Sequence, residues 1–468
     1  MLKPISISLS PNTEKDDILL TFKLLFQPWR WKKERNENNS RCIELEEEFK
    51  KYLSAKYAIA FNSGRSALMA ILNSLELNQD DEILLQAFTC NATANPIIWS
   101  GLKPVYVDCD ERTFNIDIED LKRKITPKSR AVMVQHTFGL AVNLDEILEI
   151  CRQGEEDKSS SSTELPQEAK VKKKAEPSSP HNAKARENNL ILIEDCAHSL
   201  GAEYKGRKVG TFGRAAFFSF SRDKVISSVY GGMAVTNDDE VAKKLREYQE
   251  KIGFPSYCWI FQQLLHPVLM NWLILPTYKI FGKYLLILFQ RLQILSKAVH
   301  WREKRGLRPG YFPKGLCNAL AVLALNQFKK LERFNNHRKE IAEIYRKELK
   351  EEAKPSSLTR ATAKGEEEDL SSLLELPQEK EQIYLRFAVK HPKAHEIIKK
   401  AWQKNILIGD WYTSPIAPHD TKLNKLQYQL GSCPKAEKLS RETFNLPTHI
   451  NISQREAKKI IGFLESWK

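Results

Sequence analysis

The chain has 468 residues, a formal net charge of +14 and an apolar content of 42 %. This length is too great for one compact core and predicts two domains with insertions. The positive charge favours phosphorylated ligands or an anionic membrane surface, because no helix-turn-helix, zinc-finger or RNP-like motif supports nucleic acid.

The N-terminal sequence MLKPISISLSPNTEKDD lacks the apolar core of a signal peptide. It therefore predicts a cytoplasmic protein. The eight cysteines are scattered, with no CxxC pair and no metal-ligand spacing. We expect free thiols in a reducing compartment and no bound metal.

Short apolar runs alternate with helical stretches between about residues 50 and 235. The predicted strands are Ala58–Asn62, Asp81–Leu85, Pro104–Asp108, Ala131–Gln135, Leu190–Glu194 and Ala215–Phe220. Helices are expected at Ser66–Leu75 and Leu144–Arg152. Strands that alternate with helices predict an α/β domain with a mostly parallel sheet.

Two polar segments interrupt this pattern, Glu155–Glu187 and Glu351–Gln382. Both are rich in Glu, Lys, Ser and Pro. Segments of this composition cannot bury enough apolar surface to offset the entropy lost on ordering. We predict that they are disordered surface insertions.

A third segment is apolar rather than polar. Tyr257–Tyr278 carries no charged Asp, Glu, Lys or Arg, and Lys279–Val299 is apolar with basic flanks. About 20 apolar residues can span a bilayer, but Gln, His, Asn and Pro interrupt the run. An in-plane interfacial helical hairpin fits better, with Trp259 and Trp272 as interface anchors. A buried helical pair, a dimer contact and a spanning segment are the alternatives.

A soluble pattern returns after Arg308. Leu316–Leu349 predicts one long helix or two, and a strand is expected near Tyr384–Val389. Helices should follow at Ala394–Gln403 and Gln454–Trp467. The predicted organisation is a large domain over residues 40–250, an apolar insertion over 251–310 and a smaller C-terminal α/β domain over 311–468.

The residues that suggest chemistry lie between Ile191 and Thr236. Asp195 and Lys224 each follow a predicted strand, and open α/β sheets bind ligands at the carboxyl ends of their strands. Pyridoxal-phosphate (PLP) chemistry needs a lysine for the Schiff base and an acid that keeps the pyridine nitrogen protonated. Ser219 and the turn Asn62–Ser66 are candidates for holding the phosphate. The alternative is a solvated Lys224 and an Asp195 that caps a helix.

The same region resembles the DegT/DnrJ/EryC1/StrS family of PLP-dependent sugar aminotransferases. The family patterns E-D-x-A-x-x-x-G-A, G-x-x-G, F-S-F-x-x-x-K and G-G-x-x-x-T match Glu194–Ala202, Gly210–Gly213, Phe218–Lys224 and Gly231–Thr236. Weaker matches surround them, namely Asn62–Leu68, Thr89–Asn95, Gly101–Asp108, His136 with Gly139, Cys433–Glu437 and Leu446–His449. The resemblance covers most of the chain outside the three insertions.

This resemblance implies PLP fold type I, which is aspartate-aminotransferase-like. It implies that Lys224 forms the Schiff base and moves the proton, that Asp195 pairs with the pyridine nitrogen, and that His198 lies beside the ring. These three are the catalytic candidates. The cofactor-binding candidates are Ser63, Gly64, Arg65, Cys90, Asp195, His198, Ser219 and Lys224.

Three departures from the family pattern concern the site. Cys90 stands where the family usually has an aromatic residue that stacks on the cofactor, and a thiol stacks weakly. Arg65 replaces a threonine and could pair with phosphate or with an anionic substrate. The G-x-N-Y-R-M segment, which reaches across the family's dimer, has no clear match before Leu316–Phe328. Trp411 and Tyr412 lie where the family has substrate-lining residues, and packing is the alternative.

The resemblance implies a homodimeric transferase that moves an amino group from an amino acid, glutamate by expectation, to a keto-sugar nucleotide for polysaccharide biosynthesis. We expect a cytoplasmic enzyme, and residues 257–299 leave a peripheral contact with the inner face of the membrane open as an alternative. Two alternatives stay open. One is a membrane-surface PLP-binding regulatory protein without turnover. The other is a PLP-family sugar dehydratase, although such relatives replace the lysine.

Overall fold

The structure is a computed structural model that describes residues 3–32, 40–159, 190–351 and 382–467. A seven-stranded sheet forms its centre, in the order β2-β11-β10-β7-β6-β3-β5. The strands are β2 (Tyr57–Phe61), β3 (Glu82–Gln86), β5 (Lys103–Val107), β6 (Ser129–Gln135), β7 (Ile191–Asp195), β10 (Ala215–Ser219) and β11 (Gly232–Thr236). All neighbours pair in parallel except β11, which is antiparallel to both β10 and β2.

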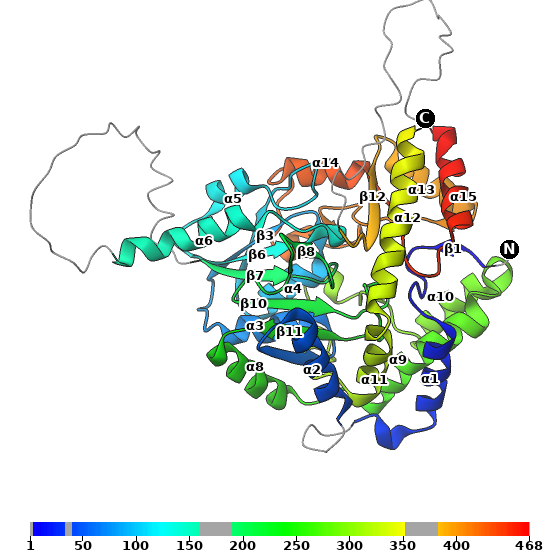
Figure 1. The fold of residues 1–468 in the computed structure, drawn as a ribbon, viewed down its shortest axis with the longest axis horizontal. Helices are drawn as coiled ribbons and strands as arrows, with labels where there is room; N and C mark the ends of the chain where they lie inside the picture. Colours follow the sequence, from blue (N-terminus) through cyan, green and yellow to red (C-terminus); the bar gives the residue numbers. More distant parts are fainter. Residues whose placement is uncertain (1–2, 33–39, 160–189, 352–381, 468) are drawn as a thin grey trace, which may run out of the picture.

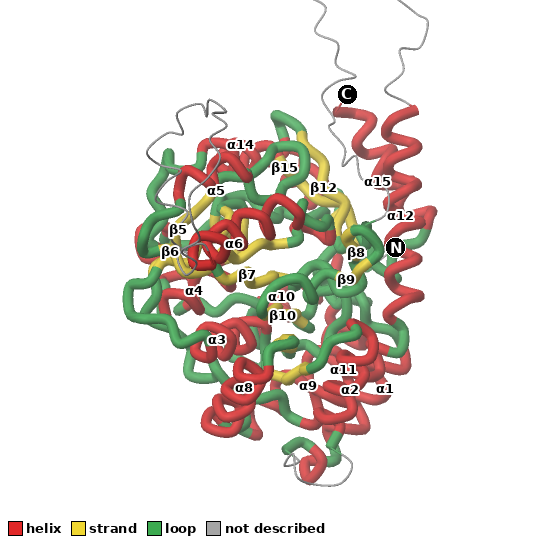
Figure 2. Tube along the Cα trace, turned by 60° about the vertical axis from the view of Figure 1, so that its left-hand side comes forward, coloured by secondary structure: helices red, strands yellow, loops and turns green. Residues whose placement is uncertain are grey.

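Helices cover both faces of this sheet (Figures 1 and 2). The strands have apolar side chains on both faces, as parallel strands buried on both sides require. In β10, Ala215 and Phe217 pack into one core cluster, and Ala216 and Phe218 into another. The first face is covered by α3 (Gly64–Ser74), α4 (Asn91–Trp99) and α8 (Asp239–Ile252). The second is covered by α2 (Arg41–Leu53), α5 (Ile118–Lys124), α6 (Leu144–Ser159) and α11 (Asn318–Phe328).

The C-terminal part is a smaller α/β arrangement. Its strands β12 (Arg386–Lys390) and β15 (Thr443–Pro447) pair antiparallel. Its helices are α12 (Leu331–Glu351), α13 (Ala394–Gln403), α14 (Pro434–Glu442) and α15 (Gln454–Leu464). The N-terminal residues join this part, because β1 (Ile5–Ser6) pairs in parallel with β13 (Ile406–Leu407).

The apolar segment forms a bent helical pair beside the N-terminal helix. It comprises α9 (Tyr257–Leu269), π-helical turns at Met270–Ile274 and Tyr278–Gly282, and α10 (Lys283–Arg291). No single helix among the described residues is long and apolar enough to cross a membrane. Only the two arms together, bent by 109°, pass the criteria of length and composition.

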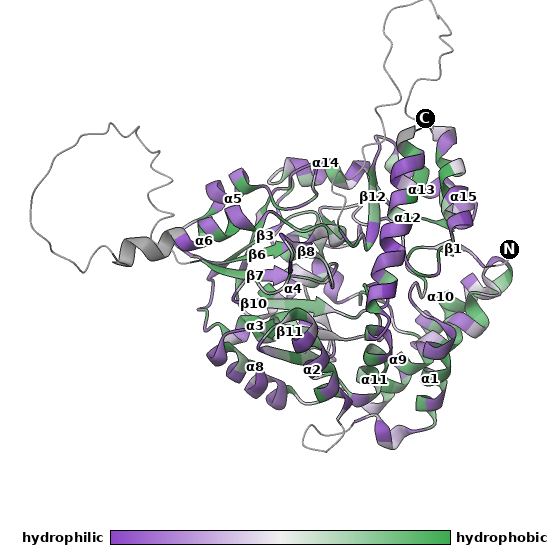
Figure 3. Ribbon diagram, in the orientation of Figure 1, coloured by the Kyte–Doolittle hydropathy of each residue, from purple (hydrophilic) through white to green (hydrophobic). Residues whose placement is uncertain are grey.

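The two arms of this segment pack differently. Helix α9 lies against α1 (Lys15–Leu25), as Figure 1 shows, and its Trp259, Ile260 and Leu264 enter the core. Helix α10 has no buried residue. Hydrophobic side chains therefore remain at the surface along this edge of the molecule. Figure 3 colours much of the ribbon of these helices as hydrophobic.

The predicted fold class is confirmed: the sheet is mostly parallel and lies between helices. Each of the six predicted strands is present with ends shifted by at most two residues. The expectation of one long helix or two resolves into α11 and α12. The polar segment Glu155–Glu187 begins inside α6, and the rest of it, like nearly all of Glu351–Gln382, lies outside the described residues. The predicted domain boundaries stay a prediction.

Candidate active site

Three neighbouring strands end at one cavity. Gln135 ends β6, Asp195 ends β7 and Ser219 lies at the end of β10, and all three line a cavity of about 290 Å³. The strands are parallel, so their carboxyl ends share one edge of the sheet. Side chains at alternate positions of a strand share a face. The cavity therefore lies on the face of the sheet that α3 covers.

Most of the predicted site residues line this cavity. They are Gly64, Arg65, Cys90, Asp195, His198, Ser219 and Lys224. Ser63 does not line it. Its hydroxyl is buried as the N-cap of α3 and accepts a hydrogen bond from the Ser66 N–H at 3.0 Å. Ser63 therefore shapes the helix start rather than facing the cavity.

Lys224 follows β10 in a loop and is half-buried, with its side chain lining the cavity. Its carbonyl oxygen accepts a hydrogen bond from the Asn12 side chain at 2.5 Å. Desolvation lowers the pKa of its amine, although the nearby Asp223 carboxylate partly offsets this. An amine with a lowered pKa is a better nucleophile and base near neutral pH.

Asp195 is buried at the end of β7. Its Oδ1 accepts a hydrogen bond from the Ala197 N–H at 2.9 Å. Desolvation raises the pKa of its carboxyl from 3.8 to about 6, despite that hydrogen bond and the charge of Lys224. No ion pair of Asp195 exists among the residues that the structure describes. The carboxylate can therefore bind an added cation such as a protonated ring nitrogen.

His198 is held neutral in a stack of aromatic rings. Its Nδ1 accepts a hydrogen bond from the Phe138 N–H at 3.3 Å, which leaves the proton on Nε2, 3.4 Å from the Tyr412 hydroxyl. Burial lowers the pKa of its imidazole well below the usual value. Trp411 stacks on it with ring centroids 5.3 Å apart. His198 can therefore donate a hydrogen bond but is poorly suited to accept a proton.

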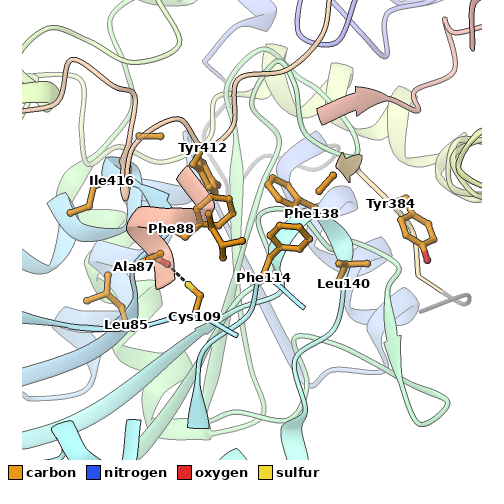
Figure 4. Close-up of a cluster of buried hydrophobic side chains, with 14 of the residues drawn as sticks. Leu85, Ala87, Phe88, Cys109, Phe114, Phe138, Leu140, Tyr384, Tyr412 and Ile416 are labelled. Atoms are coloured by element: carbon orange, nitrogen blue, oxygen red, sulfur yellow. Dashed lines mark hydrogen bonds between the residues drawn. The ribbon is translucent and has the colours of Figure 1, made fainter. Parts of the chain in front are cut away.

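Buried aromatic rings fix the loop that carries Trp411 and Tyr412. The Tyr412 ring lies 5.3 Å from that of Phe88 and 5.9 Å from that of Phe138, in the cluster shown in Figure 4. The strand pair β4 (Thr89–Cys90) and β14 (Ile416–Ala417) joins the same loop to the sheet edge. Trp411 thus lines the cavity instead of only packing.

An anion-binding cradle lies at the start of α3. The first turn of a helix leaves N–H groups without intrahelical partners, and those of Gly64 and Arg65 remain after Ser63 caps Ser66. The hydroxyls of Ser219 and Ser221, 3.1 Å apart, line the cavity beside them. A Cβ on Gly64 would lie 3.1 Å from that of Ser219. A glycine at this position keeps the space between helix and strand open.

The Arg65 side chain has a partner that the sequence did not reveal. Its Nε lies 2.5 Å from the Glu303 carboxylate, and both side chains are buried. Desolvation would lower the pKa of the guanidinium, but the Glu303 charge more than offsets this and raises it. The guanidinium is thus held by Glu303 in this structure, and its expected contact with phosphate or an anionic substrate stays a prediction.

The segment that carries Glu303 forms one wall of the cavity. We call residues 296–303 the wall segment, and its Ala298 and Val299 line the cavity. The hydroxyl of Tyr230 donates to the Lys297 carbonyl at 2.9 Å. Further hydrogen bonds reach the wall segment from Arg65, Asn95 and Arg222. The chain thus closes the cavity with its own residues at this side.

A second buried arginine lies beside Lys224. Arg386 of β12 forms an ion pair with Asp223 at 3.0 Å, and its guanidinium carbon lies 3.3 Å from the centroid of the Trp411 ring. The Lys224 amine lies over the same ring at 4.6 Å. Motif spacing gave no sign of Arg386, because its partner Asp223 is 163 positions away in the sequence.

One carboxylate explains why three of the motifs occur together. Glu194 is buried and accepts hydrogen bonds from the N–H groups of Gly210 at 2.7 Å and Gly213 at 2.8 Å. It also contacts His136 at 3.3 Å. Desolvation opposes its ionisation, but these partners hold the pKa of Glu194 below its usual value. Glu194 therefore has a structural role: it holds the loop around Asp195 and takes no part in the reaction.

These residues fit pyridoxal phosphate. The cradle at α3 suits its phosphate, Asp195 suits its ring nitrogen, and Lys224 suits its aldehyde carbon. Cys90 lines the cavity, and burial raises the pKa of its thiol, so it stays uncharged. The thiol cannot stack as an aromatic ring does, whereas the Trp411 indole offers an aromatic surface in the same cavity.

Comparison with known proteins gives similar sequences and similar solved structures. GDP-perosamine synthase from Caulobacter vibrioides is 36 % identical over 204 residues, which cover 44 % of this chain and 46 % of that protein. A pleiotropic regulatory protein from Geobacillus stearothermophilus is 24 % identical over 422 residues, which cover 89 % and 87 %. The solved structure of NtdA from Bacillus subtilis with bound cofactor PMP has a TM-score of 0.67, at 20 % identity, over 100 % of this chain and 85 % of that one.

The match to the perosamine synthase spans about half the length of that relative. The model of the DegT/DnrJ/EryC1/StrS aminotransferase family covers much more of the chain, over residues 32–155, 179–258 and 290–465. The residues it leaves out internally are 156–178, which form most of the first polar segment, and the stretch 259–289 within the apolar segment. The family expected from the motifs is confirmed: the chain belongs to the DegT/DnrJ/EryC1/StrS aminotransferase family.

Proposed function

We propose that the protein is a PLP-dependent aminotransferase that moves an amino group from an amino acid, glutamate in our expectation, to a keto sugar attached to a nucleotide. The observation that carries this proposal is that the half-buried Lys224 and the buried Asp195 line one cavity. The family and the names of relatives such as GDP-perosamine synthase support a sugar nucleotide as substrate and polysaccharide biosynthesis as the purpose.

The residues divide the work as follows. Pyridoxal phosphate, when bound, supplies an aldehyde that takes up the amino group and a ring that stores electrons. Lys224 accepts a proton from the substrate carbon and returns it, because desolvation lowers the pKa of its amine. Asp195 keeps the proton on the ring nitrogen, with its own position fixed by the Ala197 N–H.

The remaining residues of the cavity orient the cofactor and exclude water. His198 donates a hydrogen bond from Nε2 toward the ring region and is itself fixed by Phe138. The cradle of α3 with Ser219 holds the phosphate. The wall segment and Trp411 keep water away from the reacting atoms, which strengthens the electrostatic contacts inside.

The test uses the purified, PLP-loaded protein in two half-reactions. L-glutamate should bleach the visible absorbance of the lysine-bound cofactor, and a keto-sugar nucleotide should then restore it. Mass spectrometry of the sugar product should show a carbonyl oxygen replaced by an amine. A Lys224→Ala variant is the control and should show neither step.

Other outcomes would select the alternatives. A cofactor that stays bound but unchanged with every amino acid would favour the regulatory protein without turnover. A product that has lost a hydroxyl group and gained no nitrogen would favour the dehydratase. Either result would contradict the proposed aminotransferase.

We further propose that the protein is cytoplasmic and docks on the inner face of a membrane. Nearly all large hydrophobic side chains that are exposed among the described residues lie in two segments, 19–29 and 257–307, the exceptions being Trp402 and Leu430. We call these exposed side chains the apolar face. The two segments adjoin, because the rings of Phe22 and Trp272 lie 5.1 Å apart.

The positive charge of the two segments favours an anionic lipid surface as the partner that binds the apolar face. Neither Ile18–Lys33 nor Tyr257–Arg302 contains an acidic residue, whereas both contain several lysines and arginines. Tyrosine, tryptophan and basic side chains together are typical of interfacial helices. The buried side of α9, which includes Gln263 and His266, argues for lying on the surface rather than crossing it.

Vesicle flotation tests this docking. The protein should float with vesicles of phosphatidylglycerol and much less with phosphatidylcholine alone. A variant of α10 at two exposed positions, Tyr284→Ser/Ile287→Ser, should lose flotation, and Leu430→Ser, which is exposed elsewhere, should not. If the wild type does not float and the α10 variant instead breaks a dimer, the apolar face is a contact between copies.

We also propose a homodimer, as the family resemblance implies. Sedimentation should then give twice the chain mass of 54.0 kDa. A monomer that carries out both half-reactions would contradict this.

A further inference from the structure

A second cavity adjoins the active-site cavity. It has a volume of about 560 Å³ and shares Asp410, Thr413 and His419 with the first. Its other lining residues come from α13 (His395, Ile398, Lys399, Trp402 and Gln403) and from Lys283 of α10. We call this second cavity the basic chamber. None of its lining residues has a role in the reaction steps described above.

The volumes of the two cavities indicate that a large substrate extends into the basic chamber. Pockets for substrates of drug size range from roughly 300 to 1,000 Å³. The active-site cavity of about 290 Å³ lies at the lower end of that range and must also hold the cofactor. A substrate larger than a sugar ring therefore has to extend beyond it. The chamber is the adjoining space that shares its wall.

The charges in the chamber select an anion. Lys283 and Lys399 are exposed and form no ion pair with any residue in the described part of the chain. Two lysines without acidic partners suit a group with two negative charges, such as a diphosphate. Asp410 lies at the junction with the active site, where a carboxylate can accept hydrogen bonds from sugar hydroxyls.

Trp402 adds a flat surface beside these charges. Its indole N–H donates to the Ile408 carbonyl at 2.9 Å, which fixes the ring while 44 % of the residue stays exposed. A fixed, exposed indole can stack on a nucleobase, and such stacking contributes roughly 1–3 kcal/mol per base. Among the described residues, Trp402 is the only exposed aromatic residue outside the apolar face.

We propose that the basic chamber binds the diphosphate that carries the keto sugar, with Lys283 and Lys399 on the phosphates. This rests on the proposed aminotransferase and names the part of its substrate that the chamber recognises. A nucleoside diphosphate and a lipid diphosphate share this chemistry. Lys283 belongs to the apolar helix α10 and to the stretch that the family model leaves out, so this chain has its own means of holding the diphosphate.

The test measures binding rather than turnover. Isothermal titration of the PLP-loaded protein uses inorganic pyrophosphate, UDP, GDP and geranyl diphosphate as probes. A Lys283→Ala/Lys399→Ala variant should bind the preferred probe at least about tenfold more weakly. The matched control is Lys393→Ala/Lys400→Ala, which removes the same charge from exposed positions at the start and on another side of α13. Its affinity should equal that of the wild type.

The probes also distinguish the two sources. Tighter binding of UDP or GDP than of pyrophosphate, with the difference lost in Trp402→Ala, identifies a nucleotide. Tighter binding of geranyl diphosphate, unaffected by Trp402→Ala, identifies a lipid carrier. Equal affinities in the chamber variant and in its control, or no binding of any probe, would overturn the proposal.

Kinetics separates this proposal from the proposed function. In the chamber variant, KM for the sugar substrate should rise while kcat and the glutamate half-reaction stay unchanged. Failure of the glutamate half-reaction in the wild type would contradict the aminotransferase, and the titrations would still report on the chamber.

Discussion

Lys224 and Asp195 line one cavity, and in this cavity the charged form of each side chain is disfavoured. Burial lowers the pKa of Lys224 and raises that of Asp195 to about 6. Each shift disfavours the charged form, as expected when ionisable groups lose contact with water. A protonated ring nitrogen beside Asp195 would offset the desolvation of the carboxylate. Cofactor binding and the charge of Asp195 should therefore depend on each other.

Asp195→Asn should stabilise the cofactor-free protein at neutral pH. The folded-state pKa lies above the unfolded value of 3.8, so the cost of burying the charge is absent below about pH 4 and complete above about pH 6. The cost corresponds to roughly 3 kcal/mol. Urea unfolding of cofactor-free wild type and variant should show the difference at pH 7 and little of it near pH 4. A variant that is less stable than wild type at pH 7 would contradict this.

The motif residues could be found from the sequence, and their partners could not. Asp195 and Lys224 stand out because each lies at or shortly after the end of an apolar strand, in a dense set of motifs. Glu303 pairs with Arg65, and Arg386 pairs with Asp223. The partners of each pair lie far apart in the sequence, so no local pattern predicts the pair. Trp411 remained undecided between packing and lining the site, because that choice depends on which way a loop side chain points.

At the scale of elements, the wall segment shows how this chain departs from its family pattern. Residues 296–303 follow directly after the apolar helices and cover the cavity beside α3. The Arg65–Glu303 ion pair and the hydrogen bonds from Tyr230 and Arg222 hold the wall segment there. The arginine that replaces a small residue at the phosphate-binding turn thus serves to anchor the segment that follows the apolar helices.

Glu303→Gln should destabilise the protein by about 3 kcal/mol, because it leaves the buried Arg65 charge without its partner. It should also weaken PLP binding, since the wall segment borders the cavity. Chemical unfolding and a cofactor titration measure the two effects.

The control is Arg65→Met/Glu303→Leu, which removes both charges and should recover most of the lost stability. If the single variant were as stable as the wild type, the ion pair would not anchor the wall segment.

Elements with a clear apolar pattern were predictable, and those defined by distant pairing were not. The six predicted strands are short apolar runs bounded by polar or glycine residues. Strand β11 begins at a glycine and was noticed only as a motif, although it pairs with both β10 and β2. The pairing of β1 with β13 joins residues near the two ends of the chain and has no local signal.

At the scale of the whole molecule, residues 257–307 link the apolar face to the active site, because they carry most of that face, one lysine of the basic chamber and the wall segment. Helix α10 contributes exposed apolar side chains to the face and Lys283 to the basic chamber, and the wall segment follows it. A protein docked through this face would hold the chamber near the lipid surface. The composition of Tyr257–Val299 predicted an apolar surface segment. The basic chamber beside it could not be predicted, because its residues come together only in the folded structure.

Docking on anionic vesicles should weaken with salt. The Debye length falls from about 10 Å at 0.1 M to about 3 Å at 1 M salt, which screens the basic residues around the apolar face. Flotation with phosphatidylglycerol vesicles at the two salt concentrations measures this. Flotation that does not change with salt would show that the basic residues are not required for docking.

The central claim is that Lys224 holds the cofactor in the cavity at the end of β10. Borohydride reduction of the PLP-loaded protein fixes the cofactor to whichever lysine carries it, and peptide mass spectrometry then locates the modified residue. We predict a single pyridoxyl group on the peptide that contains Lys224, and none in the Lys224→Ala variant. A pyridoxyl group on another lysine, or an unmodified Lys224 after full reduction, would contradict the claim.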